Sequence, residues 1–194
     1  MSNYSLSFTG SALRKAESIL LARCFLDVKD WQSVRKSAIE DNLLMIDSPS
    51  SRKRIAAELI KRLRNLTTEE LDYLAETIPS EQSLLLWVAV CRTYQLAEDF
   101  SREVITHRFR GLCATITPGS IESFFDEQAV IHPELRSLSE QTRVRLRNQF
   151  LQMVKEAGLI DDKNQVQQVF LPQRLEALLK TAARDEAALF PTVR

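Results

Sequence analysis

Hydrophobic residues recur along most of this chain at the three- and four-residue spacing that is typical of amphipathic helices. The first such stripe runs from Ala12 to Phe25 and indicates a mostly buried helix that ends near Asp27. Asp30 is a good N-cap for a second helix, which we expect to end around Asn42. The chain therefore opens with two helices separated by a short turn.

The third predicted helix has two chemically different faces. It follows a connection that contains Pro49 and two capping candidates, Ser50 and Ser51. On a helical wheel, one sector carries the apolar residues Ile55, Leu59, Leu63 and Leu66. Roughly the opposite sector carries the basic residues Lys53, Arg54, Lys61 and Arg64. We expect one face to pack on a core and the other to be cationic.

Three further helices are predicted before the middle of the chain. A capping-box pattern at Thr67 starts the fourth. The fifth spans 81–94 and contains the run 84–91, which is apolar on every side, so we expect it at the centre of the fold. The sixth runs from 97 to about 110, where Gly111 is placed as a C-terminal stop.

The segment 111–119 predicts a boundary between two helical lobes, 1–111 and 117–194, because it gathers two glycines, a proline and β-branched residues. Thr117 followed by Pro118 opens a seventh helix that ends near Ala129. A long helix then runs from Ser139 to Ala157.

The C-terminal quarter mixes strand and helix signals. Residues 159–171 would form a short β-hairpin around the polar turn 161–165. A last helix starts at Pro172, and we expect the tail from Asp185 to be loosely held. The predicted fold class is all-α: a compact multi-helix globule, with room for one short β-hairpin near 159–171.

Composition supports a helical globule inside the cell. The 194 residues are 44% hydrophobic and 27% charged, with four glycines and six prolines, which leaves few positions for tight turns. The N-terminus lacks the pattern of a signal peptide, and the longest apolar run is far shorter than the about 20 residues of a membrane span. Cys24, Cys91 and Cys113 are widely spaced among apolar neighbours, so we interpret them as packing residues in a reducing cytoplasm.

Charge is balanced over the chain but segregated along it. There are 26 basic and 26 acidic residues, so the net charge provides no long-range attraction to nucleic acid. The segment from Arg52 to Arg64, however, contains six basic residues and one acidic residue, a local net charge of +5. The following segment, 67–76, contains four acidic residues and no basic one. Such segregation can produce the basic face that a DNA or RNA backbone requires.

A helix, a connection and a basic helix occur in this order twice, at 30–42 with 51–65 and at 120–129 with 139–157. This order suggests two helix-turn-helix-like units, in which the second helix enters the major groove and the hairpin at 159–171 corresponds to a wing. The candidate nucleic-acid-binding residues are Arg52, Lys53, Arg54, Lys61, Arg64, Arg143, Arg145 and Arg147. The alternative is that these cations are solvated faces of ordinary surface helices. Cations at a helix N-terminus oppose its dipole by about 0.3 to 1 kcal/mol each, a cost that phosphate binding would offset.

Catalytic chemistry finds little support. The two histidines, His107 and His132, are isolated, and neither a CxxC nor an HExxH motif is present. The four glycines build no phosphate-binding or dinucleotide-binding loop. Trp31 and Trp87 lie on apolar faces, and we expect both to be core aromatics and not base-stacking platforms. We expect no enzymatic activity, metal, cofactor or small-molecule substrate.

Seven segments, in this order and spacing, resemble the BrxA family of bacteriophage exclusion (BREX) systems. They are YSLSFTGSAL at 4–13, SSRKRI at 50–55, LLLWVAVCR at 84–92, FFDE at 124–127, HPEL at 132–135, TRVRLRN at 142–148 and EAGL at 156–159. The resemblance implies an all-helical cytoplasmic protein without enzymatic activity that binds DNA. It would serve a system that methylates host DNA and blocks phage replication.

We therefore expect a DNA-binding accessory protein that contacts double-stranded DNA mainly through its phosphates. One alternative is an adaptor that docks on other BREX subunits through its basic helices. Another is an RNA-binding protein, because the family has been compared with the antitermination factor NusB. The candidate binding residues come from charge and helical geometry and not from the resemblance.

Overall fold

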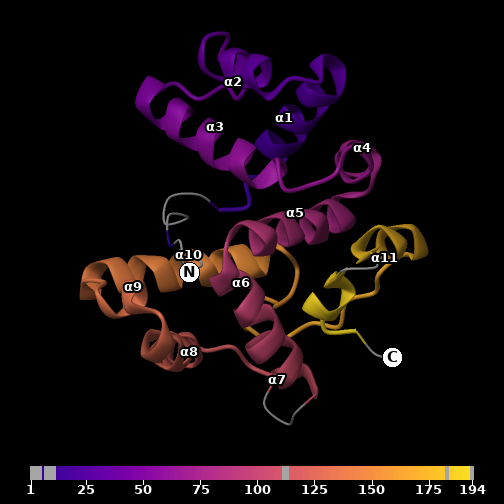
Figure 1. Ribbon diagram of the computed structural model, residues 1–194. Helices are drawn as coiled ribbons and strands as arrows, with labels where there is room; N and C mark the ends of the chain where they lie inside the picture. Colours follow the sequence, from indigo (N-terminus) through magenta and orange to yellow (C-terminus); the bar gives the residue numbers. More distant parts are fainter. Residues whose placement is uncertain (1–5, 7–11, 111–113, 182–183, 193–194) are drawn as a thin grey trace.

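In the computed structural model, three N-terminal helices pack together at one end of the molecule (Figure 1). They are α1 (Lys15–Val28), α2 (Trp31–Ile39) and α3 (Pro49–Leu63), and α4 (Thr68–Glu76) lies against α1. The structure describes residues 6, 12–110, 114–181 and 184–192. The two predicted opening helices and the third, basic helix are confirmed.

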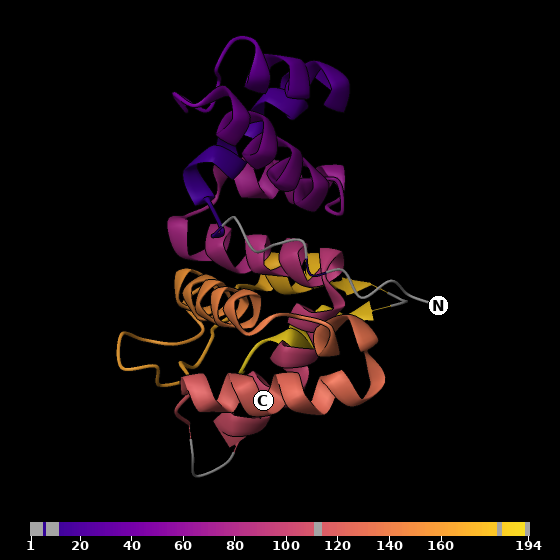
Figure 2. The same cartoon turned by 90° about the vertical axis from the view of Figure 1, so that its left-hand side faces the viewer.

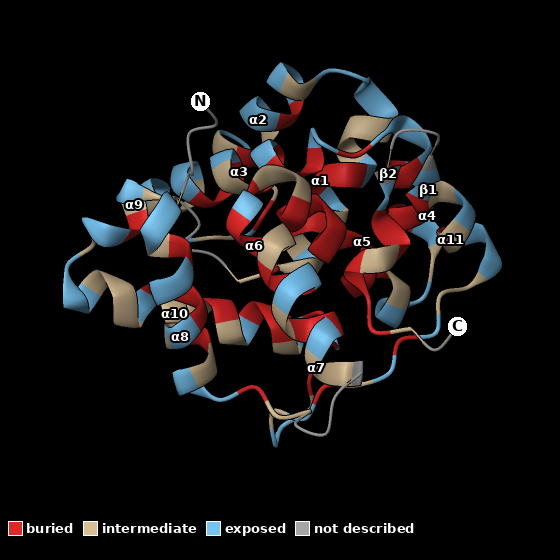
Figure 3. Ribbon diagram, turned by 60° about the horizontal axis from the view of Figure 1, so that its bottom comes forward, coloured by how far each residue is buried: buried red, intermediate tan, exposed pale blue. Residues whose placement is uncertain are grey.

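Helix α5 (Pro79–Thr93) is the central element, as predicted from its apolar run. It contacts α1, α3 and α4 on one side, and also α6 (Gln95–Phe100) and α10 (Glu140–Glu156). Every residue from Leu84 to Cys91 is buried, and Figure 3 shows α5 among the buried parts of the fold. A helix that is apolar on all sides can be stable only where neighbours cover all of it.

The remaining elements lie on the side of α5 away from α1, α2 and α3 (Figure 2). Helix α6 continues into the π-helical turn η1 (Ser101–Ile105) and α7 (Thr106–Arg110). Then follow α8 (Pro118–Ile131), α9 (Pro133–Arg136), α10, α11 (Gln173–Leu179), β1 (Lys180–Thr181), β2 (Arg184–Asp185) and the 3₁₀ turn η2 (Glu186–Leu189). The fold is all-α, as predicted. In the part of the chain that the structure describes, none of the helices combines the length and the apolar character needed to cross a bilayer.

The starts of α2 and α4 follow the capping signals of the sequence. The Asp30 carboxylate accepts hydrogen bonds from the backbone N–H groups of Gln32 and Ser33 at the start of α2. Thr67 and Glu70 form the predicted reciprocal capping box at the start of α4. These local bonds satisfy N–H groups that have no partner within the helix.

The core is continuous from the N-terminal helices to the C-terminal ones and contains a cluster of aromatic rings. The Phe150 ring packs edge to face against Trp87, Phe100 and Phe125, with centroids 6.0, 4.8 and 6.3 Å away. The indole N–H of Trp87 donates to Ser101 Oγ at 2.8 Å. The prediction that Trp87 is a core residue is thus confirmed. The predicted lobe boundary stays a prediction, since 111–113, with Gly111 and Cys113, lie outside the described residues.

The hairpin predicted at 159–171 forms only in part. Ile160 and Val166 make an isolated antiparallel bridge around the predicted turn. Beside it, the N–H of Asp161 donates to the Gln165 carbonyl at 3.0 Å and that of Gln167 to the Leu159 carbonyl at 2.9 Å. The N–H groups of Val166 and Val169 instead donate outside the hairpin, to the carbonyls of Ala114 at 2.7 Å and Pro191 at 3.0 Å. A two-stranded sheet forms instead between β1 and β2, where Lys180 pairs with Asp185.

The expectation of a loosely held tail from Asp185 is wrong. Glu186, Leu189 and Phe190 are all buried. The two apolar side chains join the core, and the carboxylate of Glu186 accepts hydrogen bonds from Arg92 on α5. Burial of apolar area and a buried ion pair together fix a segment that local sequence rules describe as a terminus.

Candidate nucleic-acid interface

Helix α3 separates its apolar and basic residues onto two faces, as the helical wheel predicts. Ile55, Leu59 and Leu63 are buried in the core. The four exposed cations are Lys53, Arg54, Lys61 and Arg64. Their spacing places them along one side of the helix. We call these four residues the α3 cationic row.

Arg52 does not belong to this row, although it is adjacent in sequence. Its guanidinium donates to the backbone carbonyls of Ile39 and Ile46, both at 2.9 Å, and of Asp47 at 3.4 Å. These bonds hold the connection between α2 and α3. Arg52 is therefore a structural residue that positions the basic helix.

The second predicted cluster, on α10, is largely neutralised by carboxylates of α8. Arg143 lies 2.6 Å from both Glu122 and Asp126, and Arg147 lies 3.0 Å from Glu122. Burial alone lowers the pKa of Arg143, but its bonds to these carboxylates outweigh burial and raise that pKa above its ordinary value. Only Arg145 of the three is exposed.

The two predicted clusters do not form one surface. Helix α5 lies between α3 and α10 and contacts both (Figure 1). A connection of nine residues separates α2 from α3, and the short helix α9 separates α8 from α10. Both connections are longer than the turn of a minimal helix-turn-helix unit, and that interpretation stays a prediction. The structure thus favours the α3 side as the cationic surface.

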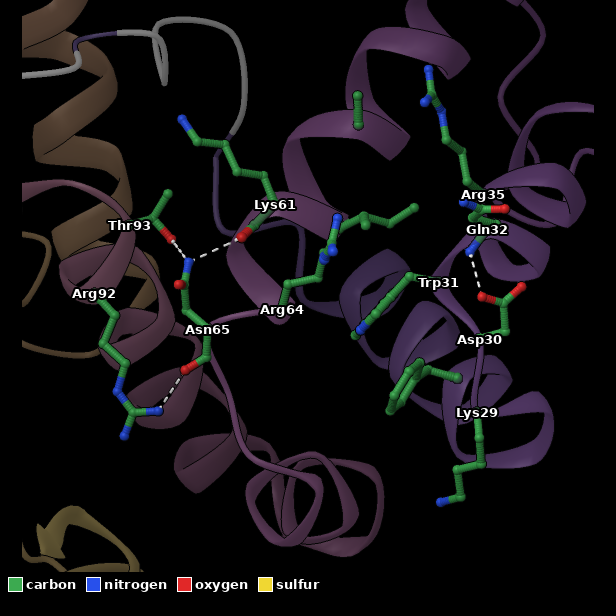
Figure 4. Close-up of a pocket in the computed structure, with 13 residues that line it drawn as sticks. Lys29, Asp30, Trp31, Gln32, Arg35, Lys61, Arg64, Asn65, Arg92 and Thr93 are labelled. Carbon is green, nitrogen blue, oxygen red and sulfur yellow. Dashed lines mark hydrogen bonds between the residues drawn. The ribbon is translucent and has the colours of Figure 1, made fainter. Parts of the chain in front are cut away.

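A groove beside α3 extends the cationic row onto other elements. It has a volume of about 970 Å³ and lies between the α1–α2 corner, α3 and the end of α5 (Figure 4). Its lining includes Lys61 and Arg64 of the row, and also Lys29, Arg35 and Arg92. We call it the α2–α3 groove. Lys29 and Arg35 were not among the predicted binding residues, since only tertiary packing brings them beside α3.

The electrostatics of the groove are mainly positive. Among the described residues that line it, Asp30 is the only acidic one. The pKa of Asp30 is lowered by hydrogen bonds from the Ser33 side chain and from the backbone of Ser33 and Gln32. The charge of Arg92 is offset by Glu70 and Glu186, both 2.6 Å away. Lys29, Arg35, Lys61 and Arg64 therefore dominate the lining.

The rim of the groove is held by bonds between α3 and the end of α5. Lys61 Nζ lies over the Tyr94 ring, 4.5 Å from its centroid. Asn65 Nδ2 donates to the Lys61 carbonyl at 3.0 Å and to Thr93 Oγ1 at 2.9 Å, while Arg92 donates to the Asn65 carbonyl at 2.7 Å (Figure 4). These contacts fix the rim before any ligand binds, which lowers the entropy cost of binding.

Trp31 lines the groove together with Phe25, and the expectation that Trp31 is a core residue is only partly right. Its indole stacks on Phe25, with ring centroids 4.2 Å apart and an interplanar angle of 16°. The side chain packs against the core on that side, but it is only half-buried and also lines the groove. Sequence patterning places Trp31 on the apolar face of α2 and carries no signal for this second exposure.

Metal-ligand side chains do not gather in the described part of the chain. Within residues 6, 12–110, 114–181 and 184–192, no group of three or more His, Cys, Asp or Glu side chains is placed to hold an ion. His107 is exposed and His132 is half-buried at the end of α8.

Comparison with known proteins places the chain in a family. A crystal structure of an uncharacterized protein from Magnetospirillum magneticum has the same fold, with a TM-score of 0.80 over 96% of each chain at 18% identity. A protein described as "BREX protein BrxA" from Escherichia coli O9:H4 (strain HS) is 27% identical over 91% of this chain and 84% of its own length. Another of the same description, from Bacillus cereus (strain H3081.97), is 27% identical over 78% of this chain and 72% of its own length. The BrxA family model matches residues 2–183, so nearly the whole chain is covered and the chain belongs to the BrxA family.

Proposed function

We propose that this chain is a non-enzymatic DNA-binding component of a BREX phage-defence system. The two relatives described as BREX protein BrxA support the assignment of this chain to a BREX system. One observation carries the DNA binding: the α3 cationic row is continuous with the α2–α3 groove, whose lining adds Lys29 and Arg35. A surface with this density of cations attracts a polyanion by releasing its condensed counterions.

Phosphate contacts are the main source of affinity in this proposal. Lysine and arginine side chains dominate the surface, whereas the amide of Asn65 is engaged by Lys61 and Thr93. Phosphate contacts position a protein on DNA, and sequence is read mainly by contacts to base edges. We therefore expect binding that is weakly sequence-specific and that weakens about a hundredfold or more between low and physiological salt.

Charge reversal on α3 tests the proposal. Lys53→Glu and Arg64→Glu lie at the two ends of the cationic row, and each should weaken binding of a duplex fragment and reduce its salt dependence. Lys180→Glu is the matched control, because Lys180 is an exposed lysine that lies on β1, outside the row. Binding is measured by fluorescence anisotropy at several salt concentrations, with circular dichroism as a check on folding. Equal affinity of all three variants and the unmodified protein would remove α3 as the DNA-binding element.

An adaptor role is the second candidate, and exposed apolar residues favour it. Val130 and Ile131 at the end of α8 are 75% and 69% exposed. A pull-down of BREX subunits with and without nuclease separates the two functions. Partners that persist after nuclease support the adaptor, and partners that disappear support bridging by DNA.

A further inference from the structure

We propose that the α2–α3 groove binds an unpaired segment of DNA, with one base stacked on Trp31 and the adjoining phosphates held by Arg35, Lys61 and Arg64. This inference rests on the proposed DNA binding and goes beyond it by naming the form of DNA that the groove accepts. Four features of the groove support this inference: the Trp31 ring stacked on Phe25, the capped helix start that holds Trp31 in place, the cations around the ring and the volume of the groove.

The Trp31 ring is already stacked on another aromatic ring. Phe25 covers one side of the Trp31 indole at 4.2 Å. Figure 4 shows Trp31, from the start of α2, and Arg64, from the end of α3, at the same opening. A base that enters there would extend the Phe25–Trp31 stack by one ring. Stacking of bases on aromatic side chains is tolerant of sequence, since every base has a π-face.

The ring is held in place by its backbone. Trp31 is the first residue of α2, and the Asp30 carboxylate caps that helix by accepting from Ser33 and Gln32. Lys29, just before the cap, adopts a left-handed conformation with φ of 53° that ends α1 and turns the chain. The corner between α1 and α2 thus presents Trp31 and Lys29 to the same groove.

Cations surround the ring on the neighbouring elements. Arg35 follows Trp31 by one helical turn on α2, and Lys61 and Arg64 lie one turn apart on α3. All three line the groove. This arrangement of an aromatic platform between basic side chains matches the alternation of base and phosphate along a single strand.

The volume of the groove suits a nucleotide, and stacking on Trp31 requires a base that is not paired within a duplex. The groove, at about 970 Å³, reaches the upper part of the range of about 300 to 1,000 Å³ that is typical of small-molecule sites. A base within a duplex is stacked on both faces, so Trp31 can reach only a base that has left the stack. We therefore expect duplex DNA to bind along the α3 cationic row without engaging Trp31.

Tryptophan fluorescence tests this directly, because the chain has only two tryptophans. Trp87 is fully buried and its N–H is bonded to Ser101, so quenching by a bound base reports on Trp31. A short oligothymidylate should quench the emission in a saturable way, whereas an ordinary duplex should bind with little quenching. Trp31→Phe keeps an aromatic ring on Phe25 and should abolish the quenching of tryptophan emission, because Trp87 is then the sole tryptophan.

Affinity provides the second readout. Trp31→Ala should weaken binding of the oligothymidylate about 5- to 100-fold and change duplex binding by less than about twofold. The emission of Trp87 and the circular dichroism spectrum check that this variant folds. An oligouridylate of the same length distinguishes DNA from RNA as the source of the base, and tighter binding of it would overturn the assignment to DNA.

The failures can be told apart. If the oligothymidylate binds without quenching, or if Trp31→Ala binds it as tightly as the unmodified protein, the stacking proposal is wrong while DNA binding stands. If neither the single strand nor the duplex binds at low salt, the proposed function itself fails.

Discussion

Arg92 on α5 lies 2.6 Å from Glu186 in the C-terminal turn η2, although 94 positions separate them in the chain. The same guanidinium also lies 2.6 Å from Glu70 on α4. All three side chains are largely buried, with 12%, 5% and 2% of their surfaces exposed. Burial on its own lowers the pKa of Arg92, but the bonds to Glu186 and Glu70 outweigh burial and raise it. This triad ties the end of the chain to its central helix.

Removal of Arg92 should therefore destabilise the fold strongly. Arg92→Met leaves Glu70 and Glu186 buried without a counter-ion, which typically costs about 3 to 5 kcal/mol. Arg102→Met is the matched control, because Arg102 pairs with Glu98 on the surface and should contribute less than about 1 kcal/mol. Urea denaturation measures both, and similar losses for the two variants would contradict a stabilising role of the triad.

The hydrogen bond between Trp87 and Ser101 should also contribute to stability. Ser101→Ala leaves the indole N–H buried without its partner, at a cost of about 1 to 3 kcal/mol in unfolding free energy. Ser123→Ala on the exposed side of α8 should change stability by less than about 0.5 kcal/mol. Thermal or urea unfolding compares the two, and an unchanged midpoint for Ser101→Ala would show that the bond adds nothing.

Asp30→Asn should strengthen DNA binding. The substitution removes the acidic charge of the groove lining and keeps an oxygen that can cap α2. Less repulsion of phosphate predicts a tighter complex at low salt, with the difference shrinking as salt screens it. Anisotropy titrations of a DNA fragment measure this, and weaker binding by Asp30→Asn would contradict the groove as a phosphate site.

Stability should depend on the ionisation of Asp30 at acid pH. Its pKa is lowered in the folded state by bonds from Ser33 and Gln32, so the folded protein favours the charged carboxylate. The resulting stabilisation is fully present above the ordinary aspartate pKa and is lost as the pH falls through the lowered folded value. The stability difference between the unmodified protein and Asp30→Asn should therefore diminish towards acid. A difference that is constant with pH would exclude this carboxylate as the cause.

Arg143→Gln should affect stability more than DNA binding. Arg143 pairs with Glu122 and Asp126 and lies over the Phe125 ring, 5.9 Å from its centroid. We expect a loss of about 1 kcal/mol, since the pairs are partly exposed to solvent. DNA affinity should stay within about twofold, whereas Arg64→Gln should weaken it and reduce the salt slope by about one. If Arg143→Gln weakened DNA binding more than Arg64→Gln in a salt-titrated assay, the result would indicate that α10, and not α3, is the DNA-binding helix.

Local sequence patterns determined which segments are helices and, at the caps Asp30 and Thr67, where they begin. The alternation of apolar and polar positions on α3, the continuous apolar run of α5 and the caps at Asp30 and Thr67 act within one or two turns. Such short-range effects can be read from neighbouring residues, and so the all-α class and the cationic face of α3 could be predicted.

Tertiary structure decided which cations remain available and what accompanies them. Arg52 donates hydrogen bonds to backbone carbonyls, and Arg143 and Arg147 form ion pairs with Glu122. Lys29 and Arg35, in contrast, line the α2–α3 groove beside α3. The same long-range packing docks the tail through Glu186 and leaves one side of Trp31 in that groove. Coulombic pairing and stacking depend on distances of a few ångströms between segments far apart in the chain, and only the packing of the helices sets those distances.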